Sequence, residues 1–366
     1  MKLRNILTLG ALGALVTLGL ASCGKKSNTN YEHGELKVSQ VTGVIRNAGD
    51  IIAEKKGFFK EEGVKVTPVN LGGTNALTAI NNNSDELDIL TTGFVPDVQA
   101  IVNGYDNLRF VGGTAVEGGA IIAKKGRASQ YKNSTTIIDY NAVKSASIAF
   151  AVGEASWVVT NEYLIENDST YTQTVRNNLN ITNVADAQTT ALQIGQGNFE
   201  LGFLPLEYAY LYEEAYGIEI VAEAGQLIPE YVCCRQVTSA QKIEEKSDAF
   251  VAYERARIKA WEYIEDDANK DKVVEIIANY IHKEEDYVEN YIYGGITKWS
   301  VDPNKQGIAT YTTALRNAGI VTDESLDITS YVDTSLYEEA ITTLASENPT
   351  DAFIQGKLQL FNDYNK

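Results

Sequence analysis

Chemistry that could bind a ligand is concentrated in five short segments rich in Gly, Ser, Thr and Asn. They are Thr42-Gly43, Gly72-Gly73-Thr74-Asn75, Thr91-Thr92-Gly93-Phe94, Gly153-Glu154-Ala155-Ser156-Trp157 and Leu204-Pro205-Leu206-Glu207-Tyr208. Where a strand ends and a helix begins, such residues offer backbone N–H groups and hydroxyls to anionic or polar ligand groups. One such loop is typical of ordinary turn and capping chemistry, but five together indicate a binding cleft.

Catalytic motifs are lacking in the sequence. Only two histidines occur, His33 and His282, and neither is placed as a general base would be. There is no Gly-x-Ser-x-Gly elbow, Walker loop or calcium loop, and the run Gly195-x-Gly197-x-x-Glu200 lacks the third glycine of a dinucleotide fingerprint. We therefore expect no catalytic residue, no metal site and no cofactor.

Two of the three cysteines, Cys233 and Cys234, are neighbours in the sequence. A disulfide between adjacent residues closes a strained ring, so the pair is a poor structural staple. The sequence places no third or fourth soft ligand nearby. We expect two small residues on a β-strand, one facing each side, rather than a redox or metal pair.

The N-terminus carries a secretion pattern. Lys2 and Arg4 precede an apolar run over 6–20, which is shorter than the ~20 residues that span a bilayer. Leu-Ala-Ser then precedes Cys23, which resembles the lipobox of bacterial lipoproteins. We predict a signal peptide over 1–22, a lipid on Cys23, and an anchor and flexible tether over 23–34. The alternative is an ordinary signal peptide that happens to contain a cysteine.

Composition limits the possible partners and the size of the core. The formal net charge is −18, and removal of the signal peptide would make the chain still more acidic. Such a chain lacks the basic surface that nucleic-acid binding requires. The remaining ~340 residues exceed what one hydrophobic core normally serves, so we expect two lobes.

Strands and helices alternate in the first part of the chain. The pattern predicts a strand over 35–41, a helix over 47–56 that stops at Gly57, and a strand over 64–69. This order is typical of an α/β fold with parallel strands. The last third predicts helices over 249–268, 273–282, 284–293 and 304–317, packed around the lobe to which the chain returns.

A weak internal repeat indicates that the two lobes are similar. A helix around 76–80, a strand around 88–93 and a helix starting near Pro96 precede Gly104. The same order recurs later in the chain, where a helix around 191–194, a strand around 200–204 and a helix starting near Pro205 precede Gly217. Each lobe would then carry ligand-binding loops at the carboxyl ends of its strands.

The stretch 53–66, Ala-Glu-Lys-Lys-Gly-Phe-Phe-Lys-Glu-Glu-Gly-Val-Lys-Val, resembles ABC-transporter substrate-binding proteins of the nitrate/sulfonate/taurine and thiamine-pyrimidine type. The resemblance implies a type II periplasmic-binding-protein fold, with two α/β lobes joined by a hinge and a ligand cleft between them. Lobe I would hold 35–117 and 230–366, and lobe II would hold 118–229. It further implies an extracytoplasmic, lipid-anchored monomer that delivers a small molecule to a membrane permease and its ATPase.

The same resemblance assigns the ligand contacts to the loops already named. The expected contacts are Thr42, Gly73, Thr74, Asn75, Gly93, Phe94, Ser156, Trp157, Leu204 and Glu207. An oxyanion such as a sulfonate, taurine or nitrate would need helix N-termini and Arg46 or Arg235. A pyrimidine-like heterocycle would need stacking on aromatic rings, including Tyr208, and a carboxylate. Phe94, Trp157 and Glu207 favour an uncharged or cationic heterocycle.

Two other classes of function compete with transport. The first is an enzyme on the same fold, because thiamine-pyrimidine synthases resemble these binding proteins; the predicted secretion and the absent catalytic motif argue against it. The second is a surface adhesin or structural lipoprotein that binds no solute. A filled cleft would favour the second.

Overall fold

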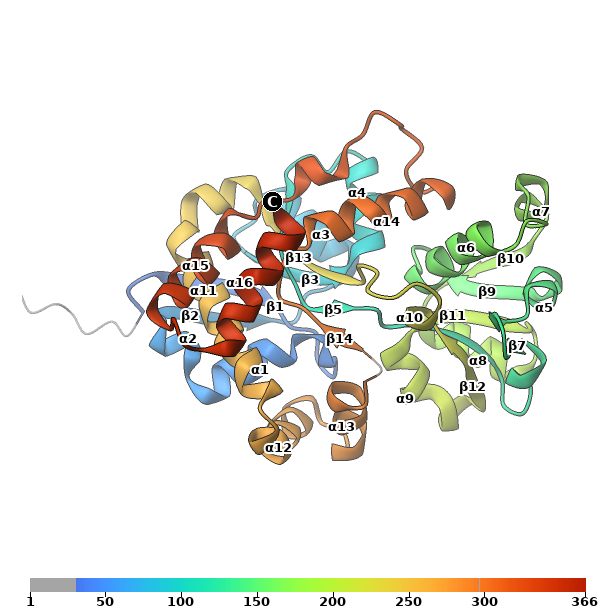
Figure 1. The fold of residues 1–366 in the computed structure, drawn as a ribbon, viewed down its shortest axis with the longest axis horizontal. Helices are drawn as coiled ribbons and strands as arrows, with labels where there is room; N and C mark the ends of the chain where they lie inside the picture. The colour runs from blue at the N-terminus through green and yellow to red at the C-terminus, as the bar shows by residue number, and fades with distance from the viewer. Residues whose placement is uncertain (1–30, 296) are drawn as a thin grey trace, which may run out of the picture.

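The computed structural model describes residues 31–295 and 297–366, which form two lobes with a narrow waist between them (Figure 1). The predicted signal peptide, the lipidated Cys23 and most of the tether lie outside the described residues. Within the described part, no helix is both long and apolar enough to cross a membrane.

The sheet of lobe I combines strands from both ends of the chain. Its strands are β1 (Gly34–Ser39), β2 (Val64–Val69), β3 (Leu90–Gly93), β4 (Leu108–Gly113) and β13 (Cys234–Ser239). β2 pairs in parallel with β1, and β13 lies antiparallel between β3 and β4. A parallel bridge from Val38 to Ile89 joins the two parts, which gives the order β2-β1-β3-β13-β4.

Lobe II repeats this arrangement with a second set of strands. They are β6 (Gly119–Lys124), β9 (Ser147–Ala151), β10 (Asn180–Val184), β11 (Leu201–Pro205) and β12 (Ile218–Glu223), in the order β10-β9-β11-β6-β12. As in lobe I, the second-last strand is antiparallel to its neighbours. The predicted repeat is confirmed, because β3 and β11 hold equivalent places and each leads into a helix and the edge strand.

Helices cover both sheets. In the first part of the chain they are α1 (Ala48–Lys56), α2 (Phe58–Glu61), α3 (Gly73–Asn81) and α4 (Phe94–Val102). In lobe II they are α5 (Tyr140–Ser145), α6 (Ala155–Asn167), α7 (Gln173–Asn177), α8 (Ala187–Gln196), α9 (Leu206–Tyr216) and α10 (Ala224–Leu227). The predicted stop of α1 at Gly57 is confirmed: its φ of 85° is left-handed backbone, which glycine adopts without a steric cost.

The C-terminal third is helical, as predicted. Its helices are α11 (Ala240–Glu265), α12 (Lys270–Ile281), α13 (Glu285–Tyr293), α14 (Lys305–Asn317), α15 (Ser335–Glu347) and α16 (Ala352–Asn365). One of them, α14, also contacts α6 of lobe II. Tyr311 Oη donates to the carbonyl of Ala155 at 3.2 Å, and the Asn317 amide donates to Glu162 at 2.8 Å.

Two crossing segments connect the lobes and pair with each other at the waist. Val116 and Val232 form an antiparallel bridge, and the Glu117 N–H donates to the Tyr231 carbonyl at 3.0 Å. A third segment joins them, because β14 (Lys298–Trp299) pairs with β5 (Ala115–Val116). The waist is therefore a small hydrogen-bonded unit, able to act as a hinge.

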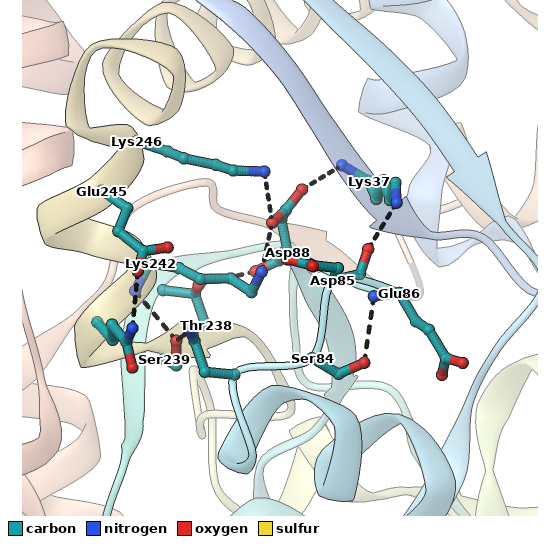
Figure 2. Close-up of polar contacts among 12 residues, drawn as sticks. Lys37, Ser84, Asp85, Glu86, Asp88, Thr238, Ser239, Lys242, Glu245 and Lys246 are labelled. Carbon is teal, nitrogen blue, oxygen red and sulfur yellow. Dashed lines mark hydrogen bonds and ion pairs between the residues drawn. The ribbon is translucent and has the colours of Figure 1, made fainter.

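A buried ion cluster fixes the start of α11 to the sheet of lobe I (Figure 2). Asp88 accepts from Lys242 Nζ at 2.9 Å, Lys246 Nζ at 2.8 Å and the Lys37 N–H at 2.7 Å. Burial opposes ionisation of Asp88, but these hydrogen bonds outweigh it and hold its pKa below the ordinary value. Lys242 and Asp88 are each only 1% exposed, so the pair is a structural anchor.

Candidate functional site

A cavity of about 210 Å³ lies between the two lobes. Its lining residues are Arg46, Thr92, Gly93, Val95, Pro96, Ala115, Gly118, Val152, Gly153, Glu154, Ala155, Pro205, Glu207, Cys233, Cys234 and Tyr291. They come from the 3-10 turn before α1 and the β3–α4 junction of lobe I, the β9–α6 and β11–α9 junctions of lobe II, the crossing segments and α13. The carboxyl ends of equivalent strands in the two lobes thus face one space, as the fold class requires.

An ion pair crosses this cavity from one lobe to the other. Arg46 belongs to the 3-10 turn Ile45–Asn47 of lobe I, and its Nη2 lies 2.7 Å from Oε1 of Glu207 in the first turn of α9. The side chains are 22% and 6% exposed, respectively. Burial disfavours the charged guanidinium, but the Glu207 carboxylate outweighs it and raises the pKa of Arg46.

A second carboxylate, that of Glu154, occupies the N-terminus of α6. Its Oε1 accepts from the Ser156 N–H at 3.1 Å and from the Ser156 hydroxyl at 2.8 Å. Burial raises the pKa of Glu154 to about 7, the hydrogen bonds from Ser156 oppose this, and the Glu207 charge adds to it. Because the chain's own carboxylate caps this helix, the N–H groups there are not free for an anionic ligand.

The neighbouring thiols Cys233 and Cys234 both line the same cavity. Their Sγ atoms are 3.5 Å apart. The expectation that the two side chains face opposite sides of a strand is therefore wrong. The physical reason is that β13 begins only at Cys234, so the strict alternation of a regular strand does not extend to Cys233.

The residues predicted as ligand contacts divide into three groups. Gly93 and Glu207 line the cavity, and Gly73 lines a neighbouring hollow of about 370 Å³ that shares Arg46 and Thr92 with it. Thr42, Thr74 and Asn75 are exposed and line neither space. The side chains of Phe94, Ser156 and Leu204 are fully buried.

The predicted aromatic contacts pack inside the lobes. Phe94 lies 5.1 Å from the Phe110 ring and 6.0 Å from the Tyr311 ring. Trp157 stacks on Phe150 at 5.3 Å within lobe II. Neither lines the cavity, so aromatic stacking on these two rings does not support a heterocyclic ligand.

The aromatic side chain that does line the cavity is Tyr291 of α13, and sequence reasoning missed it. Nothing in the local sequence separates Tyr291 from the many other tyrosines of the C-terminal helices. Tyr208, by contrast, lines the neighbouring hollow, where it lies close to the glycine loop before α3.

Of the two arginines considered for an anion, Arg46 reaches the cavity, whereas Arg235 is fully buried and donates to the Cys234 carbonyl at 2.8 Å.

Metal-binding clusters are absent from residues 31–295 and 297–366, where no three His, Cys, Asp or Glu side chains converge as ligands. The cavity therefore offers two carboxylates, one guanidinium, two thiols and a phenol. Such a set can bind a polar molecule through ionic and hydrogen-bonding contacts.

Comparison with known proteins places this geometry in a family. The sequence model of the NMT1-like family matches residues 40–278. A Bacillus subtilis (strain 168) protein named "Putative binding protein YtlA" is 25% identical over 295 residues, which cover 78% of this chain and 81% of that protein.

Solved structures with the same architecture include binding components of transport systems. The ligand-binding component of an ABC-type import system from Staphylococcus aureus, solved with zinc bound, has a TM-score of 0.64 at 14% identity, covering 84% of this chain and 99% of that one. The periplasmic nitrate-binding protein NrtA from Synechocystis PCC 6803 has a TM-score of 0.67 at 13% identity, covering 87% and 91%. The chain has the periplasmic-binding-protein fold and belongs to the NMT1-like family.

Proposed function

We propose that this chain is the extracytoplasmic solute-binding component of an ABC importer. It captures a small organic solute between its lobes and presents the closed form to a membrane permease and its ATPase. The fold, the cavity between the two lobes and the solute-binding roles of the two structural neighbours support this proposal. Hinge closure around a ligand is a general property of such two-lobed folds.

The solute that fits the cavity is a heterocycle or organic cation with N–H donors. The single observation that carries this choice is the charge of the cavity: Glu154 and Glu207 face one guanidinium, that of Arg46. A nitrate or sulfonate would meet the Glu207 carboxylate and, above about pH 7, an ionised Glu154 at the helix N-termini of lobe II, and desolvated like charges repel strongly. A donor-rich solute would instead satisfy both carboxylates.

Arg46 can also contribute to the contact with the solute. Its side chain lines the cavity and is 22% exposed, while its Nη2 is held by Glu207. A solute that carries one acceptor beside its donors, as an aminopyrimidine does, would match an exposed N–H of this guanidinium.

A thermal-shift screen tests both parts of the proposal. The full chain carrying Cys23→Ser would be heated with organic cations, pyrimidines and other heterocycles, and in parallel with sulfonates, taurine and nitrate. A solute at 100 times its dissociation constant stabilises the folded chain by roughly 2.7 kcal/mol. We expect a hit among the donor-rich compounds that is lost in Glu207→Gln.

Other outcomes would redirect the assignment. A hit confined to the oxyanions would overturn the proposed solute class but retain transport. No hit from any class would favour a structural surface lipoprotein. A tightly bound cofactor that co-purifies with the chain would favour an enzyme on this fold.

Membrane attachment through Cys23 is part of the same proposal. Expressed in a bacterial host, the wild-type chain should fractionate with membranes and carry a lipid on its new N-terminus. Cys23→Ser should release it or leave the signal peptide uncleaved. Wild-type chain recovered only in the soluble fraction would refute the anchor without affecting the proposed solute.

A further inference from the structure

The two adjacent thiols are the part of the cavity that solute binding does not explain. Cys233 and Cys234 lie where the returning crossing segment enters β13, and both face the cavity with sulfurs 3.5 Å apart. Both are free thiols in the structure. At this separation the sulfurs can be brought to bonding distance, at the cost of strain in the ring that forms, whereas residues on opposite faces of a strand could not meet.

The surroundings favour a thiolate on one of the two sulfurs. The charged and titratable groups that act on the pair are Arg46, Asp97, Glu154, Glu207, Tyr231, Arg235, Tyr291 and Tyr311. The hydrogen bond from Cys233 lowers the pKa of Cys234; burial opposes this, and Arg46 adds to it. The shared hydrogen bond and burial raise the pKa of Cys233. Cys234 is thus the attacking thiolate and Cys233 the resolving thiol.

The backbone holds both residues at the hinge. The Cys233 carbonyl accepts from the Phe94 N–H at 2.8 Å, which ties it to the start of α4. The Cys234 carbonyl accepts from the Thr114 N–H at 3.4 Å and from Arg235. Formation of a disulfide between the two sulfurs would therefore shift both the wall of the cavity and one of the crossing segments.

We propose that Cys233 and Cys234 form a reversible redox site in the wall of the solute cavity. The Cys234 thiolate attacks a small-molecule disulfide RS–SR, which breaks the S–S bond and releases RS⁻. The Cys233 thiol then loses its proton, attacks the mixed disulfide on Cys234 and releases the second RS⁻. The chain loses two electrons and two protons, and the disulfide is reduced to two RSH.

The product is an eight-membered ring with a strained disulfide, which small thiols reduce readily. Oxidation removes two S–H groups from the cavity and draws the sulfurs together beside Arg46. This inference does not depend on which solute the cavity takes. The compartment implied by the predicted signal peptide is one in which disulfides form.

The test uses the full chain with Cys23→Ser, so that Cys233 and Cys234 are its remaining thiols. The chain is incubated with bis(2-hydroxyethyl) disulfide, quenched with acid, unfolded, and labelled with N-ethylmaleimide for intact mass analysis. We expect labelled thiols to fall from two to none, with a mass lower by two hydrogens and no adduct. Dithiothreitol should restore both labels.

Single variants assign the two roles. Cys233→Ser should trap a stable mixed disulfide on Cys234. Cys234→Ser should react at least roughly tenfold more slowly at neutral pH, because burial, which this variant leaves in place, suppresses ionisation of the Cys233 thiol. Retention of two labels in the native chain, or a mixed disulfide that accumulates without closing, would overturn the proposal. Comparison of circular dichroism spectra identifies any variant that fails to fold.

Discussion

Glu154→Gln offers the sharpest test of the electrostatics of the cavity. Burial raises the pKa of Glu154 from its ordinary 4.5 to about 7. Between these values the folded chain holds a proton that the unfolded chain releases, so the free energy of unfolding falls as pH rises through this window. Glutamine keeps an acceptor for the Ser156 N–H but removes the charge. The variant should therefore be more stable than wild type above pH 7 and equally stable below pH 4.5.

The size of the effect follows from the displacement of the pKa. One pKa unit corresponds to about 1.36 kcal/mol, so the displacement from 4.5 to about 7 sets an upper bound of roughly 3 kcal/mol. Glu154 is partly exposed at the cavity, and solvent screening reduces the value. We expect Glu154→Gln to raise the free energy of unfolding by roughly 1–3 kcal/mol at pH 8.

Urea denaturation at pH 5 and pH 8 measures this difference. The matched control is Glu166→Gln, an exposed carboxylate on the same helix α6, which should change stability equally at both pH values. For each protein, the free energy of unfolding at pH 5 is subtracted from that at pH 8. The wild-type value of this change is then subtracted from that of the variant, so that the contributions of other titrating groups cancel. If this difference matches that of the Glu166→Gln control, burial of a protonated Glu154 is refuted.

Two further substitutions test the packing of the lobes. Asp88→Asn should destabilise the chain by about 3–5 kcal/mol, because it leaves the buried Lys242 without its partner. In wild type, the stabilisation that ionised Asp88 provides should be fully present above the ordinary pKa of aspartate and should be lost as the pH falls through the lowered pKa of Asp88. Urea denaturation as a function of pH measures this loss. Gly195→Ala places a Cβ in steric overlap with the Tyr216 carbonyl oxygen, so α8 and α9 must separate, at a cost of about 1–3 kcal/mol. Its control, Gly356→Ala in α16, meets no atom within 4 Å and should be neutral or stabilising; equal melting temperatures for the two glycine variants would contradict this reasoning.

The order of strands and helices was predictable because it depends on local signals. Alternating apolar residues gave β1 and β2, and Gly57 gave the end of α1. The repeat was readable because a proline lies near the start of the helix after each of the equivalent strands: Pro96 is the third residue of α4, and Pro205 is the N-cap of α9. Such patterns survive in any tertiary context that buries one face of each element.

The sequence alone thus determined the fold class, the similarity of the lobes and three of the five loops as part of the cavity wall, namely 91–94, 153–157 and 204–208. It did not determine which side chain of each loop reaches the cavity. Glu207 meets Arg46 across 161 positions of sequence, and Tyr291 arrives from a helix of the last third. Phe94 enters the core because Phe110 and Tyr311 surround it, which no local pattern encodes. Local periodicity fixes the angle between successive side chains, but only the packing of distant segments decides which face meets the other lobe.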